Sequence, residues 1–443
     1  MQSRAIAESF LEFVNYAVSP FHAVQFWKDK LSHRGFTELH EHVHWELTPG
    51  GKYFFSRNQS CLFAFIVGNQ YDPAASAFRI IGTHTDSPCP KLAPHWLNKA
   101  GGFDRLNIQL YGGGIWHSWF DRDLTLGGRV IVEEDSTLQS KLIHIKRPIL
   151  RIPNLAIHLT TERDSFTFNK ESQFKPLFAT ALGDENSEKN LLGLIAEEAG
   201  VSVESIRDLE LCVVDAIPAS LMGIHNEFIS SPRLDNLMST YCALSALLEA
   251  SEDSKDINIA MSFDNEEVGS TSMMGADSIV PDQVLTRIIE TLPGSLQSDS
   301  VFSFYRRSWM ISADMAHGIH PNYSEKHQPD HAPHVQKGVV IKINANQRYA
   351  TDHIGASVLR HLGKIANVPT QDFIVKNDSP CGSTIGPLMA AKTGIRVVDI
   401  GAPQFAMHSV REFMGTDDAH YYYHFMQAFY SRFQEISVPC ALD

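Results

Sequence analysis

Two adjacent carboxylates lie in the stretch Ser262-Phe263-Asp264-Asn265-Glu266-Glu267-Val268-Gly269-Ser270. The stretch follows Ile257-Asn258-Ile259-Ala260-Met261, an alternating run that predicts a buried strand. In an open α/β sheet, ligands bind beyond the carboxyl ends of the strands, so the pair stands where a site is expected. Because neighbouring side chains of an extended segment point to opposite sides, one glutamate can bind a metal ion while the other remains a free base. A Glu-Glu pair alone is more often a solvated acidic turn, so this interpretation depends on the rest of the chain.

The composition is that of an ordinary globular protein. The chain has 443 residues, of which 43% are hydrophobic and 20% charged, and its length suggests two or three domains. Six scattered cysteines without a CxxC pair indicate free thiols in a reducing compartment. Neither a signal segment nor a run of 18 apolar residues is found, so we expect a cytoplasmic protein with no membrane partner.

The net charge of −14 argues against nucleic-acid binding, and no basic stripe with interleaved aromatic residues occurs. The same field repels acidic ligands, so an acidic substrate requires a local cationic pocket.

The pattern of predicted helices and strands changes twice along the chain. Glycine doublets and triplets punctuate short β-rich runs after residue 96, whereas alternating helix and strand patterns precede this region and return after Pro218. We therefore predict an α/β protein, with a mixed-sheet domain formed by residues 1–95 and 222–443 and a β-rich insert at 96–221. Helices are expected at 4–17, 20–33, 190–199, 282–292 and 417–434, and strands at 52–55, 60–67, 77–82, 208–215, 257–261, 309–313, 338–344, 371–375 and 395–400. The β-rich pattern is expected to continue through 143–159.

Five polar clusters lie at or near the ends of predicted elements. They are His84-Thr85-Asp86, Arg233-Leu234-Asp235-Asn236, Glu266-Glu267, Asp314 and Met407-His408-Ser409. Unpaired charges packed together are costly, and two divalent cations would neutralise them. Each metal would take about three protein ligands, which matches two histidines and three carboxylates with one carboxylate shared. On a strand, Asp86 shares a face with His84 and can hold the far nitrogen of its ring. Taken singly, each cluster is better explained as a structural or surface feature.

In this order the motifs resemble those of the aspartyl aminopeptidases, a family of co-catalytic zinc exopeptidases. The resemblance covers nearly the whole chain and rests on five motifs: Gly82-Thr83-His84-Thr85-Asp86-Ser87-Pro88, Ser231-Pro232-Arg233-Leu234-Asp235-Asn236, Asp264-Asn265-Glu266-Glu267-Val268-Gly269-Ser270, Ser312-Ala313-Asp314-Met315-Ala316-His317 and Ala406-Met407-His408-Ser409. The stretches Leu150–Leu159 and Asn377–Pro387 resemble the family as well.

The resemblance implies a role for each residue of the clusters. It implies two zinc ions per subunit, one held by His84, Asp235 and Asp314 and the other by Asp235, Glu267 and His408. Glu266 would be the general base and Asp86 the support of His84. Cobalt or manganese also suits this ligand set.

The resemblance further implies a homo-oligomer and an acidic substrate. In this family the insert drives dimerisation, dimers build a tetrahedral dodecamer, and a histidine matching His158 reaches into a neighbouring active site. Lys342 and Tyr349 match positions of the pocket for the acidic side chain, so the expected substrates are peptides with N-terminal Asp or Glu. Gly382 and Ser383 can supply donors near the substrate, although a tightly packed loop explains them equally well.

Three alternatives stay open. A dizinc aminopeptidase or amidohydrolase with another specificity keeps the metals but changes the substrate. A catalytically vestigial assembly or cargo protein keeps the fold alone. The five histidines of the tract 317–334 form either a solvent-exposed loop, which irregular spacing and Pro333 favour, or an additional metal site.

Overall fold

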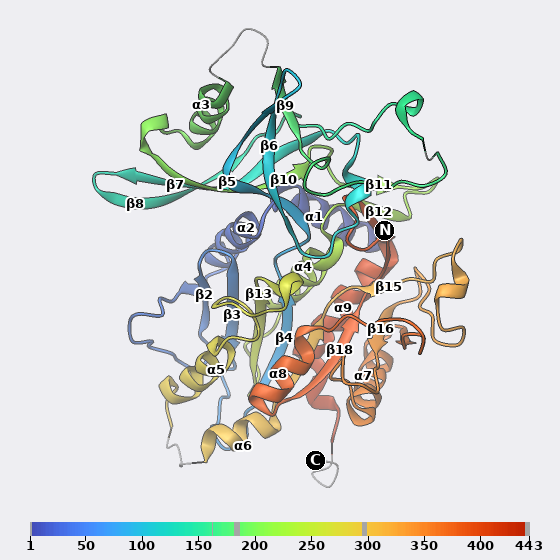
Figure 1. The fold of residues 1–443 in the computed structure, drawn as a ribbon. Coiled ribbons are helices and arrows are strands. Elements are labelled where there is room, and N and C mark those ends of the chain that lie inside the picture. The colour runs from blue at the N-terminus through green and yellow to red at the C-terminus, as the bar shows by residue number, and fades with distance from the viewer. Residues whose placement is uncertain (1, 162, 181–186, 295–298, 439–443) are drawn as a thin grey trace.

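The computed structural model describes residues 2–161, 163–180, 187–294 and 299–438 of the chain (Figure 1). A mixed central sheet contains nine strands, in the order β1 (Thr37–Glu38), β2 (Lys52–Arg57), β3 (Cys61–Val67), β13 (Ile257–Phe263), β4 (Phe78–His84), β14 (Trp309–Ala313), β18 (Arg396–Gly401), β16 (Val339–Lys342) and β17 (Thr370–Phe373). The four strands from β13 to β18 run parallel, whereas β3 and β16 pair with their outer members in the antiparallel sense. The predicted α/β fold is therefore confirmed.

Helices cover both faces of the central sheet. One core packs its first face against α1 (Gln2–Tyr16), α2 (Pro20–His33), α4 (Leu234–Leu248), α7 (His353–Ala366) and α9 (Thr416–Arg432). A second core packs the other face against α5 (Val280–Thr291), α6 (Ser300–Arg307) and α8 (Ile385–Thr393). The middle strands are buried at every position, and burial on both sides explains why most of their residues are apolar. None of the helices in the described ranges is long and apolar enough to cross a bilayer.

The start of α2 follows from its sequence. Ser19 is the N-cap, its hydroxyl accepts from the His22 N–H at 3.5 Å, and Pro20 occupies the first helical turn. A proline at this position loses no hydrogen bond, because the first amides of a helix have no intrahelical acceptor.

A second sheet lies at the top of Figure 1 and is antiparallel throughout. Its six strands follow the order β8 (Thr137–His144), β7 (Leu124–Glu134), β10 (Ile206–Asp215), β5 (Cys89–Ala100), β6 (Phe103–Tyr111) and β9 (Leu177–Thr180). It has its own apolar core, to which α3 (Ser187–Ala199) contributes Leu191 and Ile195. Strand β5 starts at Cys89, earlier than residue 96, where the sequence texture changes.

The prediction of continued β-structure through 143–159 was wrong for most of that range. Strand β8 ends at His144, only isolated bridges follow at Leu150 and Arg151, and residues 157–159 form a 3₁₀ turn. Pro148 and Pro153 interrupt the segment, and a proline cannot donate to a strand ladder.

A third, five-stranded sheet joins segments that are far apart in the sequence. Its strands are β11 (Ser220–Met222), β12 (Phe228–Ser231), β20 (Glu412–Gly415), β19 (Pro403–Phe405) and β15 (Ala316–His317). It fixes the chain just before Asp235 and on both sides of His408, because β12 precedes Asp235 while β19 and β20 flank His408.

Candidate metal centre

The polar clusters meet at the carboxyl ends of three neighbouring parallel strands. His84 is the last residue of β4 and lies beside Phe263, the last residue of β13. Glu266 follows β13 after a short turn, and Asp314 follows β14 directly. The register of the central sheet therefore places these side chains at one edge, where ligand sites of α/β sheets are found.

His84 is the centre of the first half of the site. Its Nε2 lies 3.4 Å from Asp235 Oδ1, 3.6 Å from Asp314 Oδ1 and 3.8 Å from Glu266 Oε2. His84 is only 2% exposed, so three carboxylates surround an imidazole that has little access to water.

His408 forms the second half of the site and shares Asp235 with the first. Its Nε2 lies 3.2 Å from Asp235 Oδ2 and 3.3 Å from Glu267 Oε1. The two oxygens of Asp235 thus face different histidines, which is the geometry required of a carboxylate that bridges two metal ions.

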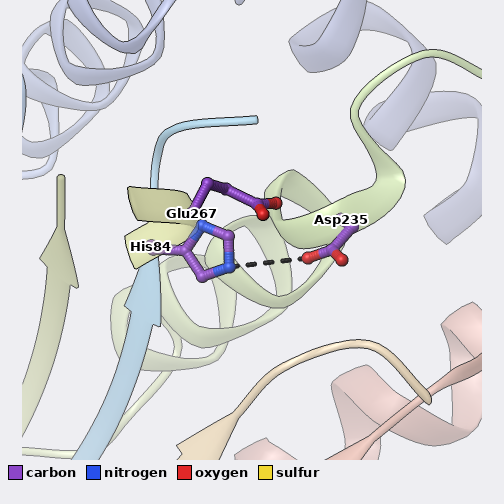
Figure 2. A group of neighbouring side chains, drawn as sticks. All are labelled: His84, Asp235 and Glu267. Atoms are coloured by element: carbon purple, nitrogen blue, oxygen red, sulfur yellow. Dashed lines mark ion pairs between the residues drawn. The ribbon is translucent and has the colours of Figure 1, made fainter. Parts of the chain in front are cut away.

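Unpaired atoms at the centre of the site point toward a common position. His84 Nε2, Asp235 Oδ1 and Glu267 Oε1 are buried without a hydrogen-bond partner. Ligand atoms of the three residues lie within 4.8 Å of one another. Figure 2 shows the three side chains gathered around one position. Buried polar atoms normally have partners, so this set fits a metal ion with nitrogen and oxygen ligands.

The charges of the cluster support the same conclusion. Burial raises the pKa of Glu267 to about 7, and the neighbouring Asp235 carboxylate adds to this effect. Burial also raises the pKa of Glu266 well above its usual range, reinforced by Asp314 and Glu267. Several carboxylates in one dry site repel each other, and divalent cations would relieve this repulsion.

Asp86 connects His84 to the glutamate pair. Its Oδ1 lies 3.3 Å from His84 Nδ1, and its two carboxylate oxygens accept from the Glu266 N–H at 3.2 Å and the Glu267 N–H at 3.1 Å. The contact of Asp86 with His84 was predicted, but the predicted reason, that both residues lie on one face of a strand, was wrong. Strand β4 ends at His84, and Asp86 reaches the ring from the following turn.

The glutamate pair is not extended either. Glu266 and Glu267 begin a 3₁₀ turn after Asn265, which has a left-handed backbone with φ of 63°. The turn still separates their directions, because Glu266 Oε2 approaches His84 while Glu267 Oε1 approaches His408.

Two further residues hold the site and were not found by sequence reasoning. The Tyr111 hydroxyl, at the end of β6, donates to Asp86 Oδ2 at 2.5 Å and accepts from Asn265 Nδ2 at 3.0 Å. Glu412 accepts from the backbone N–H groups of His408 at 2.6 Å and Asp235 at 3.1 Å. The contacts of Tyr111 with Asp86 and of Glu412 with Asp235 join residues far apart in the sequence, so no local pattern signals them. Glu412 does lie four residues after His408, which is the one local signal.

Lys342 and Tyr349 lie next to the metal-site carboxylates. The Lys342 ammonium is 3.7 Å from Asp314 Oδ2 and 5.5 Å from the centre of the Tyr349 ring. Both residues are buried, with Lys342 only 3% exposed. The exposed Ser383 donates to the Arg348 carbonyl at 3.3 Å, which places the loop containing Gly382 beside Tyr349.

His158 lies apart from the centre. It stands in the 3₁₀ turn 157–159, and no hydrogen bond or ion pair between described residues joins it to the metal-site cluster. Its apolar neighbours are strongly exposed, at 64% for Leu155, 54% for Ile157 and 70% for Leu159.

The histidine tract 317–334 makes local contacts instead of a second cluster. His327 Nε2 accepts from the His320 N–H at 3.0 Å, and His331 Nδ1 lies 2.9 Å from Gln328 Oε1. Within the described part of the chain, the one group of three metal-ligating side chains is His84, Asp235 and Glu267.

Comparison with known proteins identifies the family. Residues 13–430 match the family described as Aminopeptidase I zinc metalloprotease (M18). The aspartyl aminopeptidase of Caenorhabditis elegans is 43% identical over 98% of this chain and 96% of its own length. Aspartyl aminopeptidase 1 of Schizosaccharomyces pombe is 43% identical over 100% of this chain and 98% of its own.

Solved structures agree with this assignment. A chain in the cryo-EM structure of the Ape4 and Nbr1 complex superposes on this chain with a TM-score of 0.95 at 41% identity. The match covers 99% of this chain and 89% of that one. The S. cerevisiae mApe1 dodecamer superposes with a TM-score of 0.85 at 27% identity, covering 97% of each chain. This chain therefore belongs to the M18 family of aminopeptidase I zinc metalloproteases.

Proposed function

We propose that the protein is a dizinc aspartyl aminopeptidase, which removes N-terminal Asp and Glu residues from peptides. The observation that carries the specificity is the buried ammonium of Lys342 beside the metal site, in a chain of net charge −14. The names of the curated relatives support the same substrate class.

In this proposal two metal ions share Asp235. His84 and Asp314 complete the first ligand set, and Glu267 and His408 complete the second. Zinc bound there supplies Lewis acidity, which makes water nucleophilic and stabilises the charge that develops on the peptide carbonyl oxygen. The set of unpaired buried atoms and the bridging position of Asp235 support two ions in preference to one.

Glu266 acts as the general base. Glu266 belongs to neither proposed ligand set, so its carboxylate stays free to accept a proton. Its Oε2 lies 3.8 Å from His84 Nε2, at the edge of the cluster. Its raised pKa lets the carboxylate take the proton of the attacking water and deliver it to the leaving amine nitrogen. Asp86 fixes the backbone of this base through the Glu266 N–H.

The substrate is held at its N-terminal residue. Lys342 provides a compact positive charge for the Asp or Glu side chain, which the negative field of the whole chain would otherwise repel. Tyr349 forms the adjoining wall, and the loop with Gly382 and Ser383 offers polar groups to the substrate backbone.

We propose that the active form is a homo-oligomer, a tetrahedral dodecamer built from dimers. The insert at residues 96–221 forms the dimer contact, and residues 1–95 and 222–443 form the proteolytic domain. The exposed Leu155, Ile157 and Leu159 support a contact of this loop with a second copy. His158 would then complete the active site of a neighbouring subunit. Free cysteines support a cytoplasmic enzyme.

The decisive experiment compares kcat/KM for p-nitroanilides of Asp, Glu and Leu in the wild type and in Lys342→Met. Loss of a charge-assisted contact costs about 1.5–3 kcal/mol, so we expect Asp and Glu turnover to fall roughly 10- to 150-fold while Leu turnover does not fall. Lys392→Met is the matched control, because Lys392 on α8 pairs with Asp277, away from the metal cluster. A wild type that prefers Leu would refute the acidic specificity and favour another dizinc aminopeptidase. Absence of any peptidase activity with two metals bound would favour a vestigial site.

A further inference from the structure

Two thiols face each other across a strand pair beside the metal centre. Cys89 is the first residue of β5, and Cys212 lies in β10, the antiparallel neighbour of β5. Cys212 is paired with Lys91, so Lys91, Cys89 and Cys212 lie on one face of the second sheet, because side chains alternate along a strand. Both thiols line the same small cavity, and neither forms a disulfide.

Two cations and the Glu210 carboxylate lie near this pair and act on it in opposite directions. Both the Lys91 ammonium and the buried Arg233 guanidinium interact with the two sulfur atoms. The hydrogen bond from Cys89, helped by the Lys91 charge and opposed by burial, lowers the pKa of Cys212. A lowered pKa favours the thiolate, which is the nucleophilic form of cysteine.

A small cavity adjoins the pair. Its volume is about 30 Å³, and its walls include Cys89, Cys212 and Arg233 together with Asp235 and His408 of the metal centre. A cavity of this size accepts one molecule of about the size of water. The polar wall suits hydrogen peroxide, which is little larger than water and equally able to form hydrogen bonds.

We propose that Cys89 and Cys212 form a peroxide-responsive modification site, which closes to a disulfide and lowers the activity of the adjoining metal centre. The Cys212 thiolate attacks one oxygen of hydrogen peroxide, the O–O bond breaks, and a sulfenic acid forms as hydroxide leaves and is protonated to water. The Cys89 sulfur then attacks the Cys212 sulfur, the S–O bond breaks, and the proton of Cys89 leaves with the hydroxyl as a second water. Two thiols are oxidised by two electrons and one peroxide is reduced to two waters.

The register of the strands explains how the new bond would reach the metal centre. Cys89 and Cys212 are diagonal neighbours, and the Cα atoms of such pairs are about 7–8 Å apart. A disulfide spans about 4.4–6.8 Å between Cα atoms, so its closure draws the start of β5 toward β10.

The start of β5 is connected to the metal site by two residues. Ser87 donates its hydroxyl to the Asp235 carbonyl at 2.6 Å, and Asp86 binds the N–H groups of Glu266 and Glu267. These residues lie two and three positions before Cys89 in the chain. Movement of this segment therefore displaces the bridging carboxylate and the base together.

The test treats the zinc-loaded oligomer with hydrogen peroxide and measures two quantities. The first is a peptide that links Cys89 to Cys212, detected by mass spectrometry after alkylation of the remaining thiols. The second is kcat/KM, which we expect to fall about 10- to 100-fold, as for a catalytic group misplaced by roughly 1 Å, and to recover with dithiothreitol. Cys212→Ser and Cys89→Ser should each abolish the linked peptide and the reversible loss. Cys242→Ala, which removes a buried thiol that lies outside the site, should respond as the wild type does.

Three results would overturn the proposal. They are the absence of the linked peptide in oxidised wild type, a linked peptide without change in rate, and an undiminished reversible loss in Cys212→Ser. The linked peptide is measured on the wild type, so the first result is independent of whether the variants fold. It is also independent of the substrate specificity proposed above.

Discussion

Tyr111→Phe is expected to lower kcat strongly although Tyr111 belongs to neither ligand set. The substitution keeps the aromatic ring, over which Lys91 lies at 3.9 Å, and removes only the hydroxyl that donates to Asp86 Oδ2. Asp86 is 1% exposed, so water cannot replace the lost donor freely. A hydrogen bond to a buried charged group is worth about 1.5–3 kcal/mol.

The size of the effect follows from what Asp86 holds. Its carboxylate positions the Glu266 and Glu267 N–H groups and the His84 ring, so its displacement is felt by the base and by both proposed zinc ions. If the lost energy appears in the transition state, kcat falls roughly 10- to 150-fold. We expect KM for Asp p-nitroanilide to change less than kcat, because Lys342 and Tyr349 are not altered.

Steady-state kinetics, zinc content per subunit and the melting temperature together test this prediction. The matched control is Tyr305→Phe, since the Tyr305 hydroxyl donates to Asp282 Oδ1 at 3.0 Å between α5 and α6, away from the metal centre. A Tyr111→Phe enzyme with full zinc and a kcat within about twofold of wild type would refute the role assigned to Asp86.

Two further predictions concern stability and packing. Burial lowers the pKa of His22 to about 3, and the neighbouring His144 adds to the shift. In the unfolded chain the pKa of this histidine is near 6.5, so the unfolded state binds the proton more tightly. Stability is therefore lost as the pH falls below 6.5. At pH 4.5 the loss is about 3 kcal/mol, so His22→Gln should flatten the fall of the melting temperature between pH 7 and 4.5, whereas substitution of the exposed His33 on the same helix should not. Gly401→Ala should lower zinc content and destabilise the chain by about 1–3 kcal/mol, because a Cβ there would lie 2.3 Å from the Asp314 carbonyl oxygen. Gly193→Ala, where a Cβ meets no atom within 4 Å, is the control, and equal zinc content in the two variants would contradict the argument.

The regular elements could be predicted because their determinants are local. Ser19 and Pro20 define the start of α2, and runs rich in apolar residues define β3, β4 and β13 to within about two residues. The third sheet could not be predicted, since its strands have two to four residues each and acquire their partners only in the folded chain.

The meeting of the candidate residues could be predicted from the sequence, but the residues that support them could not. His84, Asp235, Glu267 and His408 come together as the motifs indicated. Parallel strands β4 and β13 bring His84 and Glu267 to one end of the central sheet, and the third sheet positions Asp235 and His408. The 3₁₀ turn at Glu266 and the hydrogen bond from Tyr111 depend on tertiary contacts, which leave no periodic trace in the sequence.

The segment from Tyr111 to Ile115 also decides how freely the second sheet can be exchanged for that of another protein. Tyr111 holds Asp86, the Gly113 carbonyl lies 3.1 Å from His408 Nδ1, and the Ile115 N–H donates to the His408 carbonyl at 2.8 Å. A hybrid enzyme in which a foreign sheet replaced these five residues would lose the contacts that orient His408. It would also lose the hydrogen bond from Tyr111 to Asp86, which contacts His84. A graft should therefore be joined within the second sheet, so that residues 111–115 stay with the proposed zinc ligands.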